Sequence, residues 1–209
     1  MKIAVYADTH GIAKAILNEY KTKTGYSIEK TDIEPVDLVC LLGDHSEYDV
    51  ELISQHYLGT PIIGVYGNHD IRDLYLGTNI ANIHKQLYKH NNISFTGFQG
   101  SHRYKQSQIY GYTQKEVLNE FWDLPKADIL LCHDGPYGEY YRFVDDAHCG
   151  LKGFNKYIEY NKPKIMLFGH HHDNLHFQVY NTDCYCIYGC GILTIEDYKV
   201  TDIKHYNIY

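Results

Sequence analysis

Short apolar runs recur along the chain, and a polar cluster follows each of them. Short runs in which apolar and polar residues do not alternate are typical of strands that are buried on both faces. Five runs of this kind lie at residues 3–7, 38–42, 62–66, 129–132 and 165–168. The pattern therefore predicts five interior strands.

Segments with apolar residues at helical spacing lie between several of these runs. The segments are residues 12–20, 117–122 and 151–160, and Asn161 and Pro163 follow the last of them. Strands that alternate with helices predict an α/β layered fold. After residue 168, alternation at residues 175–180, 184–188 and 192–195 predicts an antiparallel meander that closes the edge of the sheet.

Length and composition suit a globular protein with a sizeable core, because the chain has 209 residues and 44% of them are hydrophobic. No repeat or linker interrupts it, so we expect a single domain over residues 1–209. We expect no membrane span, since no run of about 18 apolar residues is present. The N-terminal run reaches Asp8 too soon for the core of a signal peptide, which favours a cytoplasmic protein.

The chain contains six cysteines. Cys40 and Cys132 lie in apolar runs, where a reduced thiol packs as a small hydrophobe, and we expect a reducing compartment. Cys184, Cys186 and Cys190 raise the alternative of a zinc site. The alternation around them, and the lack of a second cysteine pair at zinc spacing, favour a strand.

The formal net charge of −7 disfavours broad electrostatic binding to nucleic acid or to anionic membranes. Nucleic acid is therefore expected only as a substrate. Two bound divalent cations would add about +4 locally, which is enough for one cleft to attract anions despite the overall charge.

Candidate metal ligands follow all five apolar runs. The clusters are Asp8-Thr9-His10, Gly43-Asp44, Gly67-Asn68-His69-Asp70, His133 and Gly169-His170-His171-His172. Because ligands bind at the carboxyl ends of strands in open α/β sheets, we expect these side chains to converge. Carboxylate, amide and imidazole groups together suit cations such as Mn, Fe, Zn or Ni. Each cluster alone is also a common helix cap, turn or structural histidine, but five in register favour a metal site.

In this order, the five clusters resemble the motifs of the calcineurin-like metallophosphoesterase superfamily. The stretches at residues 95–98, 133–136 and 163–170 are also similar to the smaller phosphoesterases of that group. The resemblance implies two packed β-sheets, a β-sandwich, flanked by α-helices. The chain departs from the family pattern at residues 45–49, a loose form of the second motif that still retains the ligand Asp44.

The resemblance also implies two divalent metal ions, and among the candidate metals we favour Mn. The implied ligands are Asp8, His10 and His172 for one ion, Asn68, His133 and His170 for the other, and Asp44 as the bridge between them. His69 would face the substrate and act on its leaving group, while Asp70 would orient the His69 ring.

Two ions about 3.5–4 Å apart can share a bridging water and lower its pKa enough to make hydroxide near neutral pH. A protonated His69 would then stabilise the departing oxygen. We therefore expect a phosphodiesterase that acts on a small-molecule or generic phosphoester. The alternatives are a phosphomonoesterase or protein phosphatase with the same site, and a catalytically weak metal-binding scaffold.

Other residues have two interpretations each. Arg103 either contacts a substrate phosphate or is a solvated loop cation. Three tyrosines after Gly135-Pro136 either line a pocket for an aromatic ring or pack their loop, and these are Tyr137, Tyr140 and Tyr141. His45 and His171 neighbour proposed ligands, but we leave both out of the metal set.

Overall fold

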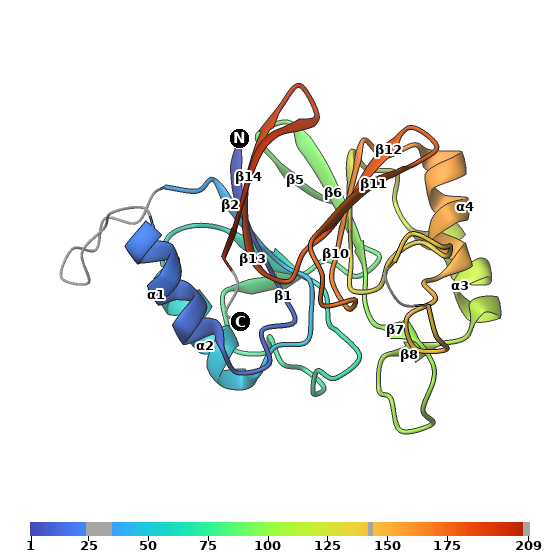
Figure 1. Ribbon diagram of the computed structural model, residues 1–209, viewed down its shortest axis with the longest axis horizontal. Helices are drawn as coiled ribbons and strands as arrows, with labels where there is room; N and C mark the ends of the chain where they lie inside the picture. The colour runs from blue at the N-terminus through green and yellow to red at the C-terminus, as the bar shows by residue number, and fades with distance from the viewer. Residues whose placement is uncertain (24–34, 142–143, 207–209) are drawn as a thin grey trace.

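The computed structural model describes residues 1–23, 35–141 and 144–206, and its core is a pair of six-stranded mixed sheets packed face to face (Figure 1). The first sheet consists, in spatial order, of β14 (Lys199–Tyr206), β13 (Gly189–Glu196), β1 (Lys2–Ala7), β2 (Leu38–Leu41), β3 (Ile62–Gly64) and β4 (Ile80–Asn82). The second consists of β11 (Leu175–Val179), β12 (Thr182–Cys186), β10 (Ile165–Phe168), β9 (Ile129–Cys132), β6 (Ile93–Phe98) and β5 (Tyr88–His90).

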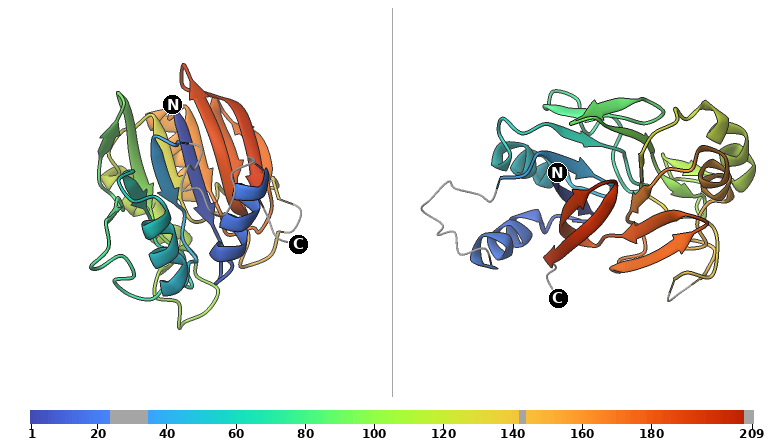
Figure 2. Two further views of the ribbon diagram at one scale, coloured as in Figure 1. Left: turned by 90° about the vertical axis from the view of Figure 1, so that its left-hand side faces the viewer. Right: turned by 90° about the horizontal axis from the view of Figure 1, so that it is seen from above.

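Helices cover the outer face of each sheet, as the two views in Figure 2 show. On the first sheet lie α1 (Ala13–Lys23) and α2 (Glu47–His56). On the second lie α3 (Gln114–Glu120), the 3₁₀ turn η1 (Phe121–Asp123) and α4 (Lys152–Asn161). Beyond β6, the short strands β7 (Ser101–His102) and β8 (Gly111–Tyr112) pair with each other. The result is a sandwich with a helical layer on either side, as expected from the sequence.

Alternate residues of the central strands enter different apolar layers. In β1, Ile3 and Val5 point into the core between the sheets, whereas Ala4 and Tyr6 pack under α1 and α2. Such a strand has no polar face, which explains why it is a continuous apolar run. All five predicted strands and all three predicted helices are present in the structure.

The predicted meander is correct for its first hairpin and wrong for its third strand. Strands β11 and β12 pair in antiparallel fashion, as expected. The other edge of β12 is already paired in parallel with β10, so β13 cannot add to it. Instead, β13 crosses to the other sheet, where it pairs with β1 and β14.

The crossing of β13 also separates the three cysteines for which a zinc site was considered. Cys184 and Cys186 lie in β12, in the core beneath α3 and α4, whereas Cys190 lies in β13 beneath α1. The strand interpretation is therefore confirmed. None of the described helices is both long enough and apolar enough to cross a membrane.

Replacing Leu131 by alanine tests the core between the sheets. Leu131 is fully buried in β9, so Leu131→Ala is expected to lower the free energy of unfolding by about 2–5 kcal/mol. Urea unfolding measures the change. The matched control is Leu58→Ala, because Leu58 is 85% exposed and its loss should change the free energy by no more than about 0.5 kcal/mol. Equal effects would show that the core lies elsewhere.

Candidate metal centre

The predicted ligands converge at one end of the sandwich, but they come from both sheets and not from a single open sheet. Asp8, Asp44 and Asn68 follow β1, β2 and β3 of the first sheet. His133 and His170 follow β9 and β10 of the second. Two contacts between a side chain and the backbone join the strand ends of the two sheets. His133 Nδ1 lies 2.8 Å from the Leu42 carbonyl, and the His170 N–H donates to Asp8 Oδ2 at 2.8 Å.

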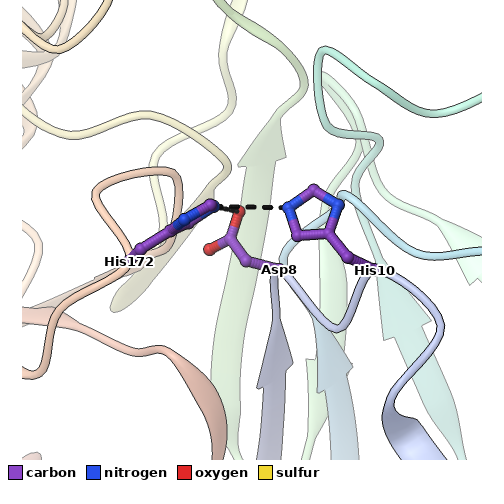
Figure 3. A group of neighbouring side chains, drawn as sticks. All are labelled: Asp8, His10 and His172. Atoms are coloured by element: carbon purple, nitrogen blue, oxygen red, sulfur yellow. Dashed lines mark hydrogen bonds and ion pairs between the residues drawn. The ribbon is translucent and has the colours of Figure 1, made fainter. Parts of the chain in front are cut away.

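One group of potential ligand atoms is formed by Asp8, His10 and His172, whose atoms all lie within 4.8 Å of one another. The two imidazole rings point toward each other across the Asp8 carboxylate (Figure 3). The Nε2 atoms of His10 and His172 are 3.3 Å apart, and His172 Nε2 is 3.6 Å from Asp8 Oδ1. Ligands about 2 Å from one tetrahedral ion lie about 3.3 Å apart, so this spacing fits a cation.

A second group is formed by Asp44, His133 and His170, also within 4.8 Å of one another. Asn68 joins it, because its Oδ1 lies 2.9 Å from His133 Nε2. Asp44 Oδ2 is 3.5 Å from His133 Nε2 and 3.9 Å from His10 Nε2. Asp44 therefore lies between the two groups, where a bridging ligand has to lie.

In the neutral form of His133, which is the form that binds a cation, the hydrogen bonds of the ring leave electron pairs facing one another. Burial lowers the pKa of His133, but without a cation the Asp44 and Asp8 charges outweigh it and raise that pKa. Nδ1 of His133 donates to the Leu42 carbonyl, which in the neutral ring leaves Nε2 without a proton. That nitrogen then faces the carbonyl oxygen of Asn68 and the Asp44 carboxylate, both of which are acceptors. A cation at this point would turn three repelling lone pairs into ligands, and the backbone carbonyl would orient the ring as in many metal sites.

Asp8 supplies the observation that tests the fit to a metal. Its Oδ1 atom is buried and has no hydrogen-bond partner among the described residues. Buried carboxylate oxygens normally accept a hydrogen bond, and Asp8 Oδ1 has only the His172 ring at 3.6 Å, so it is consistent with a ligand that the polypeptide does not provide. The donor set of carboxylate, amide and imidazole groups therefore fits divalent cations.

Electrostatics keep two of these groups in the protonation states that bind cations. Burial raises the pKa of Asp8, but the His172 and His133 rings outweigh it and lower that pKa to about 2. Burial also lowers the pKa of His170 to about 4. His170 Nε2 lies 2.9 Å from the Ala147 carbonyl, so the neutral ring donates there and keeps a lone pair on Nδ1. Deprotonated Asp8 and neutral His170 are the ligand forms at neutral pH.

The backbone is left-handed at most of the predicted ligands. Positive φ angles are uncommon outside glycine and cost roughly 1–3 kcal/mol each, and they cluster at functional sites. The angles are 52° at Asp8, 43° at His10, 58° at Asp44, 69° at His170 and 49° at His172. The sharp turns aim side chains into the pocket immediately after each strand ends.

Two glycines allow the chain to approach the carboxylates closely. A Cβ atom on Gly67 would lie 2.1 Å from Asp44 Oδ1, and one on Gly169 would lie 2.6 Å from Asp8 Oδ2. Both separations are shorter than any non-bonded contact, so a side chain at either position would displace a predicted ligand. These glycines are therefore required by space and not only by the turn.

The structure gives Asp70 a different role from the one expected. Its carboxylate accepts backbone hydrogen bonds from Gly67 at 2.7 Å, His45 at 2.7 Å and Asp44 at 3.2 Å. Asp70 therefore ties the turn after β3 to the turn after β2 and does not orient the His69 ring. Burial and the nearby Asp44 charge raise the pKa of Asp70 to about 7.

His69 lies at the exposed rim of the centre. Its backbone N–H donates to Asp44 Oδ1 at 2.8 Å, which places the residue beside the predicted bridging ligand. Its ring centroid is 6.0 Å from that of His10, and its Nε2 is 3.4 Å from the Tyr104 hydroxyl. The ring is thus next to both predicted ligand groups and open to solvent, where a substrate can reach it.

Two histidines beside predicted ligands point to other partners, as expected. His45 Nδ1 lies 2.7 Å from the Thr9 hydroxyl. His171 Nε2 lies 3.3 Å from Asp134 Oδ1, and its ring stacks on Tyr141 at a centroid distance of 3.6 Å. Tyr141 is therefore a packing residue.

The remaining side chains with two interpretations contact neighbours within the chain. Arg103 donates through Nε and Nη2 to the Gly111 carbonyl, at 3.0 and 2.6 Å, and so closes its own loop. Tyr140 stacks on Phe177 with a centroid distance of 4.4 Å. Tyr137 is 42% exposed, with the Lys152 ammonium 4.7 Å from its ring. None of these contacts involves a predicted ligand.

The sequence reasoning missed Asp49, which fixes the turn that carries Asp8. The buried Asp49 carboxylate accepts hydrogen bonds from the Thr9 hydroxyl at 2.7 Å, the Gly11 N–H at 2.6 Å and the Ala13 N–H at 2.9 Å. Ser46 and Asp49 also form the capping box of α2. The spacing Ser-x-x-Asp before a helix was the available signal, although it indicates a helix start and not a contact with residue 9.

The comparisons with known proteins agree with this arrangement. The family model for calcineurin-like phosphoesterases matches residues 1–174. The chain therefore belongs to the calcineurin-like phosphoesterase family, whose substrates are phosphoesters. No curated protein matches the sequence.

Solved structures resemble the chain over nearly its whole length. One is TT1561 from Thermus thermophilus, at 14% identity and a TM-score of 0.66, with 99% of each chain covered. Another is an archaeal phosphodiesterase, at 16% identity and a TM-score of 0.52, with 96% of this chain and 97% of that one covered. A third is the phosphopantetheinyl hydrolase of Mycobacterium tuberculosis, at 11% identity and a TM-score of 0.56, with 90% and 89% covered. At these identities the likeness shows the fold.

Asp44→Asn tests whether one carboxylate serves both ligand groups. The amide keeps the shape and the acceptor for the His69 N–H but loses the charge that bridges two cations. We expect the metal content to fall from two ions per chain to one or fewer, as measured by elemental analysis after loading with Mn. Asp202→Asn, at an exposed position of β14, is the control and should keep two. If both variants bind two ions per chain, Asp44 is not a bridging ligand.

Asp49→Asn tests the support of the Asp8 turn through its pH dependence. Burial raises the pKa of Asp49, but the bonds from Thr9, Ala13 and Gly11 outweigh it and hold that pKa below the ordinary value. A lowered folded-state pKa stabilises the protein above the unfolded pKa of about 3.9, and this stabilisation is lost as the pH falls below it.

We therefore expect metal-free wild type to exceed Asp49→Asn in unfolding free energy by about 1–3 kcal/mol at pH 5–7. The difference should shrink below about pH 4. Urea unfolding across this range provides the measurement. A difference that grows on acidification would contradict the assignment.

Proposed function

We propose that the protein is a phosphodiesterase that uses two divalent cations, with Mn favoured, and the His69 side chain. One observation carries the proposal: Asp44 lies between two groups of potential ligand atoms, one of them fully buried, and His69 lies on its open side. The proposed ligands are Asp8, His10 and His172 for one cation, Asn68, His133 and His170 for the other, and Asp44 for both.

When bound, two such cations supply Lewis-acid polarisation of phosphoryl oxygens and a nucleophile near neutral pH. The residues of the chain supply position and protons. Five of the proposed ligands are buried and would hold the cations from the side of the core, namely Asp8, Asp44, Asn68, His133 and His170. His10 and His172 are exposed and would hold one cation from the solvent side. His69 Nε2 is the exposed donor at the rim and gives its proton to the oxygen that departs from phosphorus. Asp70 keeps the turns that carry Asp44 and His69 together.

His69 is placed to protonate the departing oxygen of a phosphoester, a step that diester and monoester hydrolysis share. The preference for a diester is therefore supported by a solved structure of the same fold and not by the position of His69. The archaeal phosphodiesterase with the same fold shows that this architecture accommodates diesters in another protein. A panel of bis-p-nitrophenyl phosphate against p-nitrophenyl phosphate, with added Mn, Ni or Zn, tests the preference. A clear excess of monoesterase activity would favour the phosphomonoesterase alternative.

His69→Ala is expected to keep both metals and to lose turnover of bis-p-nitrophenyl phosphate by about 10²–10⁴-fold, because a proton donor is removed and the ligands stay. Metal content and kcat are measured on the same preparation. His176→Ala is the matched control, because His176 stacks on Tyr185 and pairs with Asp183 on β11 and β12. Full turnover in a metal-replete His69→Ala protein would exclude this role, and two bound metals without any turnover in wild type would favour a scaffold.

A further inference from the structure

The loop between β7 and β8, residues 103–110, forms one wall of a surface pocket next to His69. The pocket is lined on one side by Asn68, His69 and Ile71, and on the other by Tyr104, Lys105 and Ile109. It adjoins the rim histidine and contains only one of the predicted metal ligands. A group that leaves phosphorus in the direction of His69 therefore enters this pocket.

Tyr104 is the residue of this loop that reaches the centre. Its hydroxyl is 3.4 Å from His69 Nε2 and 3.5 Å from Asn68 Nδ2. The Asn68 amide is the donor in its contact, so it occupies a lone pair of the hydroxyl oxygen and leaves the hydroxyl proton available. A substrate oxygen placed between His69 and Tyr104 would receive that proton as a hydrogen bond.

The position of Tyr104 is held by the loop itself. Gln108 Oε1 accepts from the N–H groups of Tyr104 and Lys105, at 2.8 and 3.0 Å, and its amide nitrogen donates to Ser101 Oγ at 3.3 Å. The Arg103 guanidinium closes the neck of the loop on the Gly111 carbonyl. A hydroxyl fixed in this way needs little reorganisation when a substrate binds.

The outer part of the pocket is apolar. Ile71 and Ile109 are 48% and 46% exposed, and they line the pocket together with Tyr104. Single exposed isoleucines are common on protein surfaces and do not indicate a binding site. Here two of them line one pocket with an aromatic ring next to His69, which provides a surface for an apolar or planar group. The Lys105 ammonium lies 5.1 Å from the centre of the same ring, which brings a positive charge to the pocket.

We propose that residues 103–110 bind the leaving group of the substrate, with Tyr104 donating a hydrogen bond to the departing oxygen and Ile71 and Ile109 contacting an apolar or planar leaving-group body. This rests on the proposed function. The bond between phosphorus and the leaving oxygen breaks as the oxygen of water bonds to phosphorus, the water releases one proton to solvent, and His69 regains a proton from solvent after the step. His69 supplies the proton to the leaving oxygen, and Tyr104 keeps its own proton.

The first test uses methyl aryl phosphate diesters whose phenols differ in pKa. A hydrogen bond to the departing oxygen matters more for a poor leaving group. Tyr104→Phe is therefore expected to lower kcat/KM about tenfold for the least acidic phenols and about twofold for p-nitrophenol, with two metals still bound. The control is Tyr180→Phe, at a 65% exposed turn between β11 and β12. Its kcat/KM should depend on the pKa of the leaving phenol in the same way as that of wild type. A Tyr104→Phe loss that is equal for all leaving groups, or absent, would overturn the assignment.

The second test does not depend on turnover. Phenylphosphonate and methylphosphonate carry the same anionic head and a P–C bond that the enzyme does not hydrolyse, so the ratio of their affinities for Mn-loaded protein reports the contribution of the pocket. Ile109→Ala is expected to weaken the binding of phenylphosphonate about fivefold and to leave the binding of methylphosphonate unchanged. Equal effects on both would exclude the apolar contact. If wild type hydrolyses no diester, the proposed function fails, while the phosphonate pair still decides whether the pocket exists.

Discussion

The structure depends on one unfavourable arrangement: electron-rich atoms are held face to face, from the buried pair His133 and Asn68 to the exposed pair His10 and His172. His133 Nε2 faces the Asn68 oxygen at 2.9 Å, and the Nε2 atoms of His10 and His172 are 3.3 Å apart. Without a cation or a proton between them, such atoms repel one another, so the surrounding chain has to impose their positions. Left-handed turns, the close approach of Gly67 to Asp44, and the three backbone bonds to Asp70 perform this task.

The two sheets share the centre, and neither of them contains it alone. Asp8, His10 and Asp44 extend from the first sheet, whereas His133 and His172 extend from the second. The distance between the two ligand groups is therefore set by how the sheets pack on each other. The fully buried layer between the sheets is close-packed, and close-packed interiors deform little. The packing of the apolar core thus fixes the distance between the two groups of predicted ligands at the end of the strands.

Selectivity has a different physical origin from phosphate binding. The proposed metal centre would recognise features that all phosphoesters share, namely charge and oxygen atoms. The loop of residues 103–110 lies outside that shell and is fixed by Gln108 and Arg103. A loop of this kind can differ between relatives without disturbing the cations, which is a common way for one fold to serve several substrates. In this chain it presents Tyr104 toward the rim.

The sequence by itself determined five interior strands, three helices and the candidate ligands, because apolar runs, helical spacing and clustered Asp and His residues are local properties. It did not predict the interior strand β6 or the helix α2. Only the tertiary structure decided which sheet β13 joins, since that depends on the edge of β12 already being paired. It also decided that Asp70 binds backbone amides, and that Tyr104 meets His69, 35 positions away. No local pattern encodes such contacts, because they arise from the packing of distant turns at one end of the sandwich.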